Sequence, residues 1–465
     1  MRHLVMVVPG LGGSVLADKY GPVWDAGLGD IAGLITHPER LDVNASPTLT
    51  ATGLITSKRW LPGWTVVHGY ERLLAALGDR LEARVDLGDP SAPDWTATVA
   101  AFPYDFRRGI ADAAEALATN VKTRLDALGS AEGEPRVIVV AHSLGGLIVR
   151  YWLGPLGGWK CCRAVVTLGT PHRGAPKALD WLVNGARVGP KRLAGATDLI
   201  RGWQSVFELL PRYQAVWDEG SAAPMYPYEL GIGWFTKRAA AAFKVHEEIE
   251  AAWDAVPRRG PEVVAAVGWS HHTLLGARWD GERLRVSKAT PEWVDALGWE
   301  QELGDGTVPA TSAVPLEMSG SGQGLIRVRE RHSPLVDARQ VVDLIAAYEA
   351  RGSIDAVRGT EDDKRQPAIG LDLEDAYLAG ETLPLSIGLH NCSPTATTTV
   401  WATIRTRGVP GKTDIAMEPD DDGGFLAELP LAPDAGMHDL SVLATELAGA
   451  GELTVADSFA TVEPA

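Results

Sequence analysis

Short apolar runs alternate with amphipathic segments along residues 1–350 of the chain. The runs are rich in Val, Leu, Ile and Ala, a composition typical of strands buried on both faces. They occupy residues 5–8, 95–101, 137–140, 163–168, 262–267 and 325–328. Helical periodicity lies between them, for example over residues 70–81, and Ser333-Pro334 predicts the N-cap and first position of a last helix. Repeated strand–helix units predict a mostly parallel sheet with helices on both faces.

A different pattern begins near residue 370. Short strand-like segments separated by turn residues follow one another there, without helical periodicity. They occupy residues 383–389, 397–404, 425–429, 439–444 and 453–459. This spacing predicts an all-β sandwich of about immunoglobulin size. We therefore divide the chain into a catalytic domain (1–350), a polar linker (351–369) and a sandwich domain (370–465).

Charge supports this division. Residues 371–465 contain 16 acidic and three basic side chains, and so carry −13 of the net charge of −17. A chain this acidic is not expected to bind nucleic acid. The acidity also argues against the sandwich as a surface for anionic membranes, and the sequence does not identify a protein partner for it.

The sequence also bears on localisation and cofactors. No apolar run approaches the ~18 residues of a membrane helix, and the N-terminal run is too short for a signal peptide. Cys161, Cys162 and Cys392 do not form a disulfide framework. We expect a cytoplasmic protein. Neither the Cys nor the His spacing indicates a zinc site, so we expect no metal and no cofactor.

The central strand pattern leads into a candidate nucleophile. It ends in Ala141-His142-Ser143-Leu144-Gly145 and continues as an apolar helical pattern. A strand, a sharp turn with Ser at its apex and a helix form a nucleophile elbow, which requires small residues two positions before and after the Ser. The elbow predicts Ser143 as nucleophile and the N–H of Leu144 as an oxyanion donor. The alternative is an ordinary turn with a surface serine.

A glycine-rich loop follows the first strand, with the sequence Pro9-Gly10-Leu11-Gly12-Gly13-Ser14. The G-x-G-x-x-G spacing of dinucleotide-binding loops is absent. In a serine hydrolase, a loop at this place supplies the second oxyanion donor, which we expect to be the N–H of Leu11. The alternative is a loop whose glycines serve only a tight turn.

A serine becomes a strong nucleophile when a His accepts its proton and a carboxylate holds that His. In this kind of sheet the chain order is Ser, acid, His. His172 precedes every suitable acid, and we expect His142 to point away from the elbow. Asp305 lies in a glycine-flanked turn, and His332 lies between a strand and the last helix. We therefore expect Asp305 and His332 to complete a triad with Ser143, although each alone also fits an ordinary loop residue.

An insertion at residues 180–260 interrupts the alternation of strands and helices. Eleven of the 32 aromatic residues of the chain fall within 180–253, and no strand pattern is clear there. In an enzyme with an apolar substrate such an insertion is a lid, which makes Trp181 and Trp203 candidate substrate-binding residues. The alternative is an ordinary helical core filled by aromatic side chains.

Six segments together resemble α/β-hydrolases of the lecithin:cholesterol acyltransferase type, a family that includes lysosomal phospholipase A2. The segments are Pro9-Gly10-Leu11-Gly12-Gly13, Pro103-Tyr104-Asp105-Phe106-Arg107-Arg108, Ala141-His142-Ser143-Leu144-Gly145-Gly146, Leu168-Gly169-Thr170-Pro171, Gly304-Asp305-Gly306-Thr307-Val308-Pro309 and His332. Thr170-Pro171-His172-Arg173-Gly174 is similar to bacterial triacylglycerol lipases. The resemblance implies an α/β-hydrolase fold with a lid over an acyl groove. It also implies Ser143, Asp305 and His332 as the triad, with Leu11 and Leu144 as oxyanion donors.

Three hypotheses of function follow. The first is a serine lipase or esterase that cleaves esters of apolar acyl chains through an acyl-enzyme. The second is an O-acyltransferase with the same triad. The third is an inactive hydrolase-like interaction protein. For the first two we expect a lipid or other ester as substrate, with transient membrane contact through the lid.

Overall fold

The central sheet consists of seven parallel strands. The computed structural model describes residues 3–25, 38–56, 59–61, 65–131, 134, 136–189, 191–257, 260–295, 303–318, 324–351 and 366–463. The sheet order is β18-β15-β10-β9-β1-β8-β7. The strands are β1 (Leu4–Val8), β7 (Val85–Asp86), β8 (Val99–Ala101), β9 (Val137–His142), β10 (Cys162–Leu168), β15 (Glu262–Gly268) and β18 (Leu325–Val328). Every residue of β1 and β9 is buried, as their unbroken apolar sequences predict.

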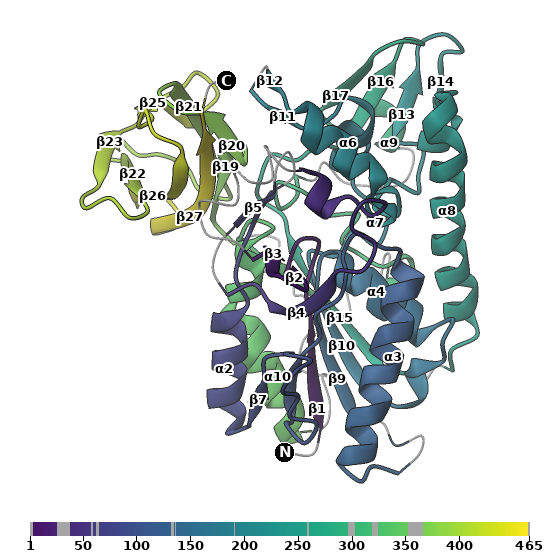
Figure 1. Cartoon of the computed structure of the whole chain (residues 1–465). Coiled ribbons are helices and arrows are strands. Elements are labelled where there is room, and N and C mark those ends of the chain that lie inside the picture. The colour runs from purple at the N-terminus through teal and green to yellow at the C-terminus, as the bar shows by residue number, and fades with distance from the viewer. Residues whose placement is uncertain are drawn as a thin grey trace.

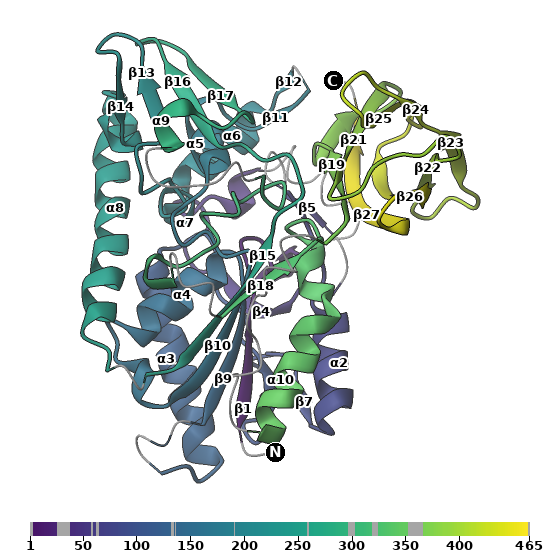
Figure 2. The same ribbon diagram turned by 180° about the vertical axis from the view of Figure 1, so that it is seen from behind.

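Helices cover both faces of this sheet. α2 (Glu71–Leu81) and α10 (Arg339–Arg351) pack on one face, and α3 (Ile110–Ala127) and α4 (Leu144–Leu153) pack on the other (Figure 1, Figure 2). Successive side chains of a strand point to opposite faces. Alternate residues of β1 therefore enter two separate hydrophobic clusters, one with α3 and α4 and one with α2 and α10. This is the predicted α/β-hydrolase fold.

The segment between β1 and α2 forms two small antiparallel sheets. One contains β2 (Ser14–Asp18), β3 (Gly21–Trp24) and β4 (Thr50–Leu54), and the other pairs β5 (Arg59–Leu61) with β6 (Thr65–Val67).

Short 3-10 helices occur at η1 (Pro38–Leu41), η2 (Gly158–Lys160), η3 (Pro227–Glu229), η4 (Leu316–Met318) and η5 (Pro334–Asp337). Among the described residues, no helix combines the length and apolarity that crossing a bilayer requires.

A cap follows β10. Its first segment contains α5 (Pro176–Val183), β11 (Arg187–Val188), β12 (Lys191–Arg192), α6 (Ala194–Gly202), α7 (Gln204–Phe207), β13 (Val216–Asp218), β14 (Ala223–Met225) and α8 (Gly233–Asp254). A second excursion after β15 adds β16 (Gly276–Trp279), β17 (Leu284–Ser287) and α9 (Glu292–Asp295). These excursions meet in a four-stranded sheet of order β14-β13-β16-β17. The expectation of no strand in the insertion was therefore wrong, because β11 pairs with β12 and β13 with β14 inside residues 180–260, and β13 also pairs with β16 outside them.

The C-terminal region is a sandwich of two sheets, as predicted. One sheet has the order β19-β21-β25-β24 and the other β20-β27-β26-β22-β23. The strands are β19 (Ala368–Asp372), β20 (Ala376–Leu378), β21 (Thr382–His390), β22 (Thr399–Thr406), β23 (Thr413–Ala416), β24 (Glu418–Pro419), β25 (Phe425–Pro430), β26 (Gly436–Leu447) and β27 (Gly451–Val462). A separate hydrophobic cluster fills the space between the sheets. Residues 352–365 of the predicted linker lie outside the described residues.

Two local predictions were confirmed only in part. The strand predicted over residues 95–101 is present only at Val99–Ala101. Ser333 does not cap a helix with its side chain, because its hydroxyl donates to the carbonyl of Val66 instead. Pro334 begins the short helix η5, and extended backbone at Ala338 separates η5 from α10.

The cap is tied to the sheet domain through Glu208. This carboxylate follows α7 and accepts a hydrogen bond of 2.6 Å from the N–H of Ile110, the first residue of α3. A carboxylate at a helix N-terminus is favourable, but burial opposes its charge. Burial dominates and raises the pKa of Glu208 to about 7.

We predict that this carboxyl group makes the stability of the protein pH-dependent. Its folded-state pKa of about 7 lies above its ordinary value of 4.5, so its stabilising contribution is present below pH 4.5 and is lost as pH rises through 7. The free energy of unfolding should fall by up to about 3 kcal/mol across this range. Urea unfolding at pH 5 and pH 8 measures it. Glu208→Gln should remove the difference, while Glu247→Gln on exposed α8 surface should keep it; an unchanged pH dependence in Glu208→Gln would contradict the assignment.

Candidate active site

Ser143 lies at a strained turn between β9 and α4. Its φ of 52° and ψ of −124° place a non-glycine residue in a backbone region that L-amino acids rarely adopt. The turn is fixed by a hydrogen bond of 2.9 Å from the N–H of Ser143 to the carbonyl of Leu168. The surroundings leave no room for larger neighbours, since a Cβ on Gly145 would lie 2.5 Å from the carbonyl oxygen of Pro9. This is the geometry of a nucleophile elbow.

The structure brings Ser143, His332 and Asp305 into one hydrogen-bonded line. Nε2 of His332 lies 2.9 Å from Oγ of Ser143. Nδ1 of the same ring lies 2.7 Å from Oδ2 of Asp305. His332 follows β18, and its own N–H donates to the carbonyl of Asp305 at 2.8 Å. All three side chains are buried, so the line is shielded from solvent.

The turn that carries Asp305 is built around the carboxylate. Its Oδ1 accepts hydrogen bonds from the N–H groups of Thr307 (2.9 Å) and Val308 (2.7 Å), which leaves Oδ2 for His332. Gly169 lies beside this pair. A Cβ on Gly169 would be 2.7 Å from Oδ2 of Asp305 and 3.0 Å from Nδ1 of His332, so a larger residue would collide with both side chains. The carboxylate is therefore held in one orientation, as the glycine-flanked sequence predicts.

The glycine-rich loop after β1 lies against the elbow. A Cβ on Gly10 would lie 2.9 Å from the Cβ of Ser143, so only glycine fits there. Leu144 is the first residue of α4, where a helix leaves N–H groups without intrahelical acceptors. Among the described residues, the N–H groups of Leu11 and Leu144 donate to no protein acceptor. Both are therefore free to donate to a ligand.

Two tyrosines fix this loop. The hydroxyl of Tyr104 donates to the carbonyl of Pro9 at 2.9 Å, and its N–H donates to Oγ of Ser14 at 3.0 Å. Oη of Tyr70 accepts the N–H of Gly10 at 2.9 Å. The loop thus has a fixed backbone on both sides of Leu11.

Tyr70 also connects this loop to His332 through His142. Because Tyr70 accepts from Gly10, its own proton donates to Nδ1 of His142 at 2.8 Å. Nε2 of His142 then carries the proton and donates to the backbone carbonyl of His332 at 3.0 Å. Burial lowers the pKa of His142 to about 3, so the ring is neutral at physiological pH. The expectation that His142 points away from the elbow missed this role, because only the fold brings α2 beside it.

The Tyr104-Asp105-Phe106-Arg107-Arg108 segment joins the loop to the cap. Arg107 is fully buried and forms a bidentate ion pair with Asp105, at 2.8 and 2.7 Å, and donates to the carbonyl of Ser46 at 2.9 Å. The hydroxyl of Ser205 in α7 donates to the carbonyl of Phe106 at 2.5 Å. This segment therefore contacts the glycine-rich loop after β1 on one side and the cap on the other.

Both candidate substrate-binding tryptophans are buried in the cap. Trp203 packs edge-on against Phe106, with ring centroids 5.4 Å apart, and its indole N–H donates to the carbonyl of Leu41 at 3.2 Å. Trp181 belongs to the same hydrophobic cluster and lines a cavity of about 300 Å³ between the cap and β20. Their role in binding a substrate stays a prediction.

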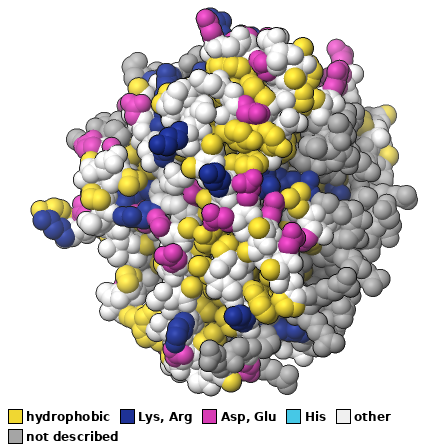
Figure 3. All heavy atoms as spheres, turned by 90° about the vertical axis from the view of Figure 1, so that its right-hand side faces the viewer, with side chains coloured by type: hydrophobic (Ala, Val, Ile, Leu, Met, Phe, Trp, Pro, Cys, Tyr) yellow, Lys and Arg dark blue, Asp and Glu magenta, His cyan; other side chains and the backbone are white. Residues whose placement is uncertain are grey.

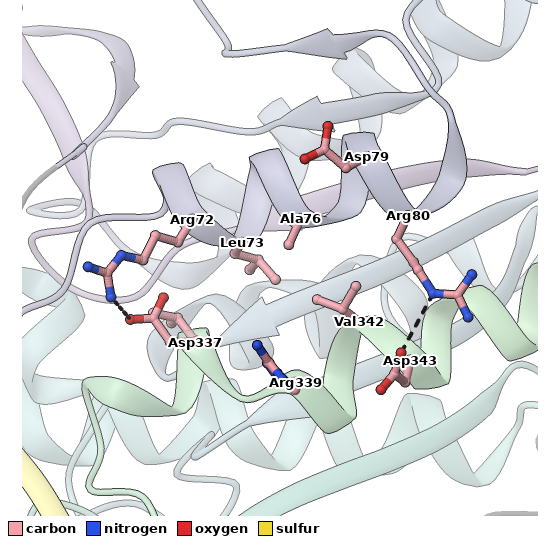
Figure 4. A pocket seen from close by; sticks show the side chains of 10 residues that line it. Arg72, Leu73, Ala76, Asp79, Arg80, Asp337, Arg339, Val342 and Asp343 are labelled. Carbon is pink, nitrogen blue, oxygen red and sulfur yellow. Dashed lines mark ion pairs between the residues drawn. The ribbon is translucent and has the colours of Figure 1, made fainter.

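A surface groove of about 740 Å³ lies between α2 and α10 (Figure 4). Two ion pairs cross it: Arg72 of α2 with Asp337 of η5 at 3.8 Å, and Arg80 of α2 with Asp343 of α10 at 3.6 Å. None of its lining side chains belongs to the line of Ser143, His332 and Asp305. The groove is therefore separate from the candidate active site.

Part of the chain is similar to a known family of proteins. Residues 94–234 match the family model of lecithin:cholesterol acyltransferase. The chain is an α/β-hydrolase similar to the lecithin:cholesterol acyltransferase family. The matched segment contains the Tyr104–Arg108 motif, the elbow and most of the first cap segment, and it ends before Asp305 and His332. The likeness supports an enzyme that acts on esters.

Other comparisons add little. No curated protein matches the chain. A lipase from Bacillus licheniformis in propeptide form is 11% identical over 99% of this chain and 93% of that chain, with a TM-score of 0.33. A superoxide reductase from Ignicoccus hospitalis is 12% identical over 24% of this chain and 92% of that chain, with a TM-score of 0.18. Superpositions with scores this low carry no argument about fold or function.

We predict that the Tyr70–His142 connection stabilises the protein measurably. Tyr70→Phe leaves the N–H of Gly10 and Nδ1 of His142 buried without partners, which should lower the free energy of unfolding by about 1–3 kcal/mol. Urea unfolding measures this, with Tyr20→Phe as the control because Tyr20 is 84% exposed. ¹⁵N NMR should find His142 as the Nε2–H tautomer. An unchanged stability, or the Nδ1–H tautomer, would contradict the assigned hydrogen bonds.

Proposed function

We propose that the protein is a serine lipase or esterase that cleaves carboxylic esters of apolar acyl chains through an acyl-enzyme. The observation that carries the proposal is the continuous line from Oγ of Ser143 through His332 to Asp305, at 2.9 and 2.7 Å. A hydroxyl, an imidazole and a carboxylate in this order form a nucleophile, a general base and the group that orients the base. The family likeness supports the same class of reaction.

In the first half of the reaction, Oγ of Ser143 attacks the ester carbonyl while Nε2 of His332 takes its proton. Asp305 holds the ring in the correct tautomer and stabilises the imidazolium. The N–H groups of Leu11 and Leu144 donate to the oxyanion of the tetrahedral intermediate, and α4 adds the positive end of its dipole. Collapse of the intermediate releases the alcohol, which takes the proton from His332.

In the second half, His332 removes a proton from water, and the resulting nucleophile attacks the acyl group on Ser143. Expulsion of Oγ, which takes the proton back, releases the acid and restores the enzyme. An alcohol in place of water would give a new ester. One observation favours this second candidate function, an O-acyltransferase: Ser143 and His332 are each only 3% exposed, and exclusion of water favours transfer over hydrolysis.

Contact with a lipid surface would occur through the cap. The second residue of α8 is Trp234, a large hydrophobic side chain that is 44% exposed. On the side of the molecule shown in Figure 3, hydrophobic side chains gather in several patches that charged side chains border. This mixture fits a transient contact rather than stable insertion.

We predict that Ser143→Ala abolishes esterase activity. Removal of the nucleophile should lower kcat by at least about a thousandfold. Release of p-nitrophenol from esters of increasing chain length measures it. Ser221→Ala, an exposed serine of the cap, is the matched control and should retain full activity. Activity retained in Ser143→Ala would overturn the proposal.

Product analysis separates the two reactions. With a long-chain ester and an added lipid alcohol, a hydrolase yields mainly free fatty acid. A predominant new ester would replace hydrolysis with acyl transfer as the function. Turnover limited to acetate and butyrate esters would contradict the apolar acyl specificity.

A further inference from the structure

The C-terminal sandwich contacts the two loops that carry Asp305 and His332. On the acid side, the N–H of Leu371 in β19 donates to Nδ1 of His271 at 3.1 Å, and Nε2 of His390 donates to the carbonyl of Ser270 at 3.0 Å. His271 in turn pairs through its backbone with Gly304, next to Asp305. The sandwich therefore backs the turn that holds the carboxylate.

His271 also reaches the loop of His332. Its Nε2 donates to the carbonyl of Arg329 at 2.7 Å, while its Nδ1 accepts from the sandwich. Burial lowers the pKa of His271 to about 3, so the ring is neutral and keeps this tautomer. His271 thus joins three segments. Its backbone pairs with the acid turn, and its side chain bonds to β19 and to the segment between β18 and His332.

The sandwich contacts the loop that carries His332 through an ion pair. Arg331, the residue before His332, places Nε 2.9 Å from Oδ2 of Asp457 in β27, and its Nη2 donates to the carbonyl of Leu373 at 2.9 Å. Both charged side chains are buried, with 6% and 7% exposed. The guanidinium also lies on the acid turn, since a Cβ on Gly306 would be 2.7 Å from Nη2.

We propose that the sandwich is a working part of the active site, in which Asp457 holds Arg331 and thereby positions His332 against Asp305. The argument rests on the proposed function above. Arg331 and Asp457 are positioning residues, because neither touches the reacting atoms. A buried ion pair of this kind fixes a geometry more than it adds stability, and loss of one partner leaves an uncompensated charge beside the triad.

The sign of the charge that remains determines the effect on His332. Without Asp457, the buried cation of Arg331 is left uncompensated beside the triad and disfavours the imidazolium that forms when His332 takes the proton of Ser143. Without Arg331, the buried carboxylate of Asp457 is left there instead. The other ionisable groups that face this pair are Asp375, Glu374 and Tyr377 of the sandwich, with His271 and His68 of the catalytic domain.

The same junction contains a matched control. Asp372 in β19 pairs with Lys288 of the catalytic domain at 2.6 Å. The side chains of Lys288 and Asp372 are 34% and 39% exposed, so this ion pair is in contact with solvent. Asp372→Asn therefore removes an ion pair between the same two domains, at a solvated position away from His332. Exposed pairs contribute little.

The experiment compares Asp457→Asn, Arg331→Met and Asp372→Asn in the full-length chain. We expect kcat to fall by about tenfold or more in the first two variants, with KM little changed, since a small displacement of a general base is costly. Asp372→Asn should match the wild type in every measurement.

A second readout does not depend on activity. The proton between Nδ1 of His332 and Asp305 should give a low-field ¹H NMR signal in the wild type and in Asp372→Asn, and the signal should broaden or disappear in Asp457→Asn. Arg331→Lys keeps the cation and should restore part of the signal if Arg331→Met fails to fold. A wild type that hydrolyses no ester would defeat the proposed function, while the NMR comparison would still test the role of the sandwich.

Two outcomes would overturn the proposal. One is an Asp457→Asn protein with wild-type kcat and the wild-type low-field signal. The other is faster turnover in Asp457→Asn, because a sandwich that obstructs the site would be released by the substitution rather than deprived of a support.

Discussion

The hydrogen bond between Oγ of Ser143 and Nε2 of His332 is the contact on which the site depends. It joins residues 189 positions apart, so no local sequence preference can form it. Parallel strands bring their carboxyl ends to one edge of the sheet, and this places the loops after β1, β9 and β18 together. The strain at Ser143 and the absence of a side chain at Gly10 allow the final approach. The packing of the sheet around this turn holds the backbone of Ser143 in its strained conformation.

Periodicity and chain order predicted much of this arrangement. The buried strands, the helices around them and the sandwich follow from hydrophobic patterns that each element carries by itself. The order of elbow, glycine-flanked turn and loop histidine was enough to select Ser143, Asp305 and His332, which the structure brings together. The partners that fix them were not predictable. Tyr70, His142 and Asp457 act through contacts between distant segments, and no local pattern marks such pairs.

The cap shows the same limit. β13 pairs with β16, which follows β15 in the chain, so the four-stranded cap sheet forms only where two separate excursions from the central sheet meet. Ser143 and the two side chains in line with it are buried, so we expect an ester substrate to reach Ser143 only after part of the cover moves, as lids do. The Tyr104–Arg108 segment links the cap to the glycine-rich loop after β1, so the two are physically connected.

The central claim is that Ser143 carries the acyl group during the reaction. Brief incubation with a long-chain p-nitrophenyl ester, an acid quench and peptide mapping by mass spectrometry test it most directly. We predict that the mass of the acyl group is found on the peptide that contains Ser143, and on no other peptide. An acyl group on a different residue, or turnover without any covalent adduct under conditions that slow deacylation, would contradict the account.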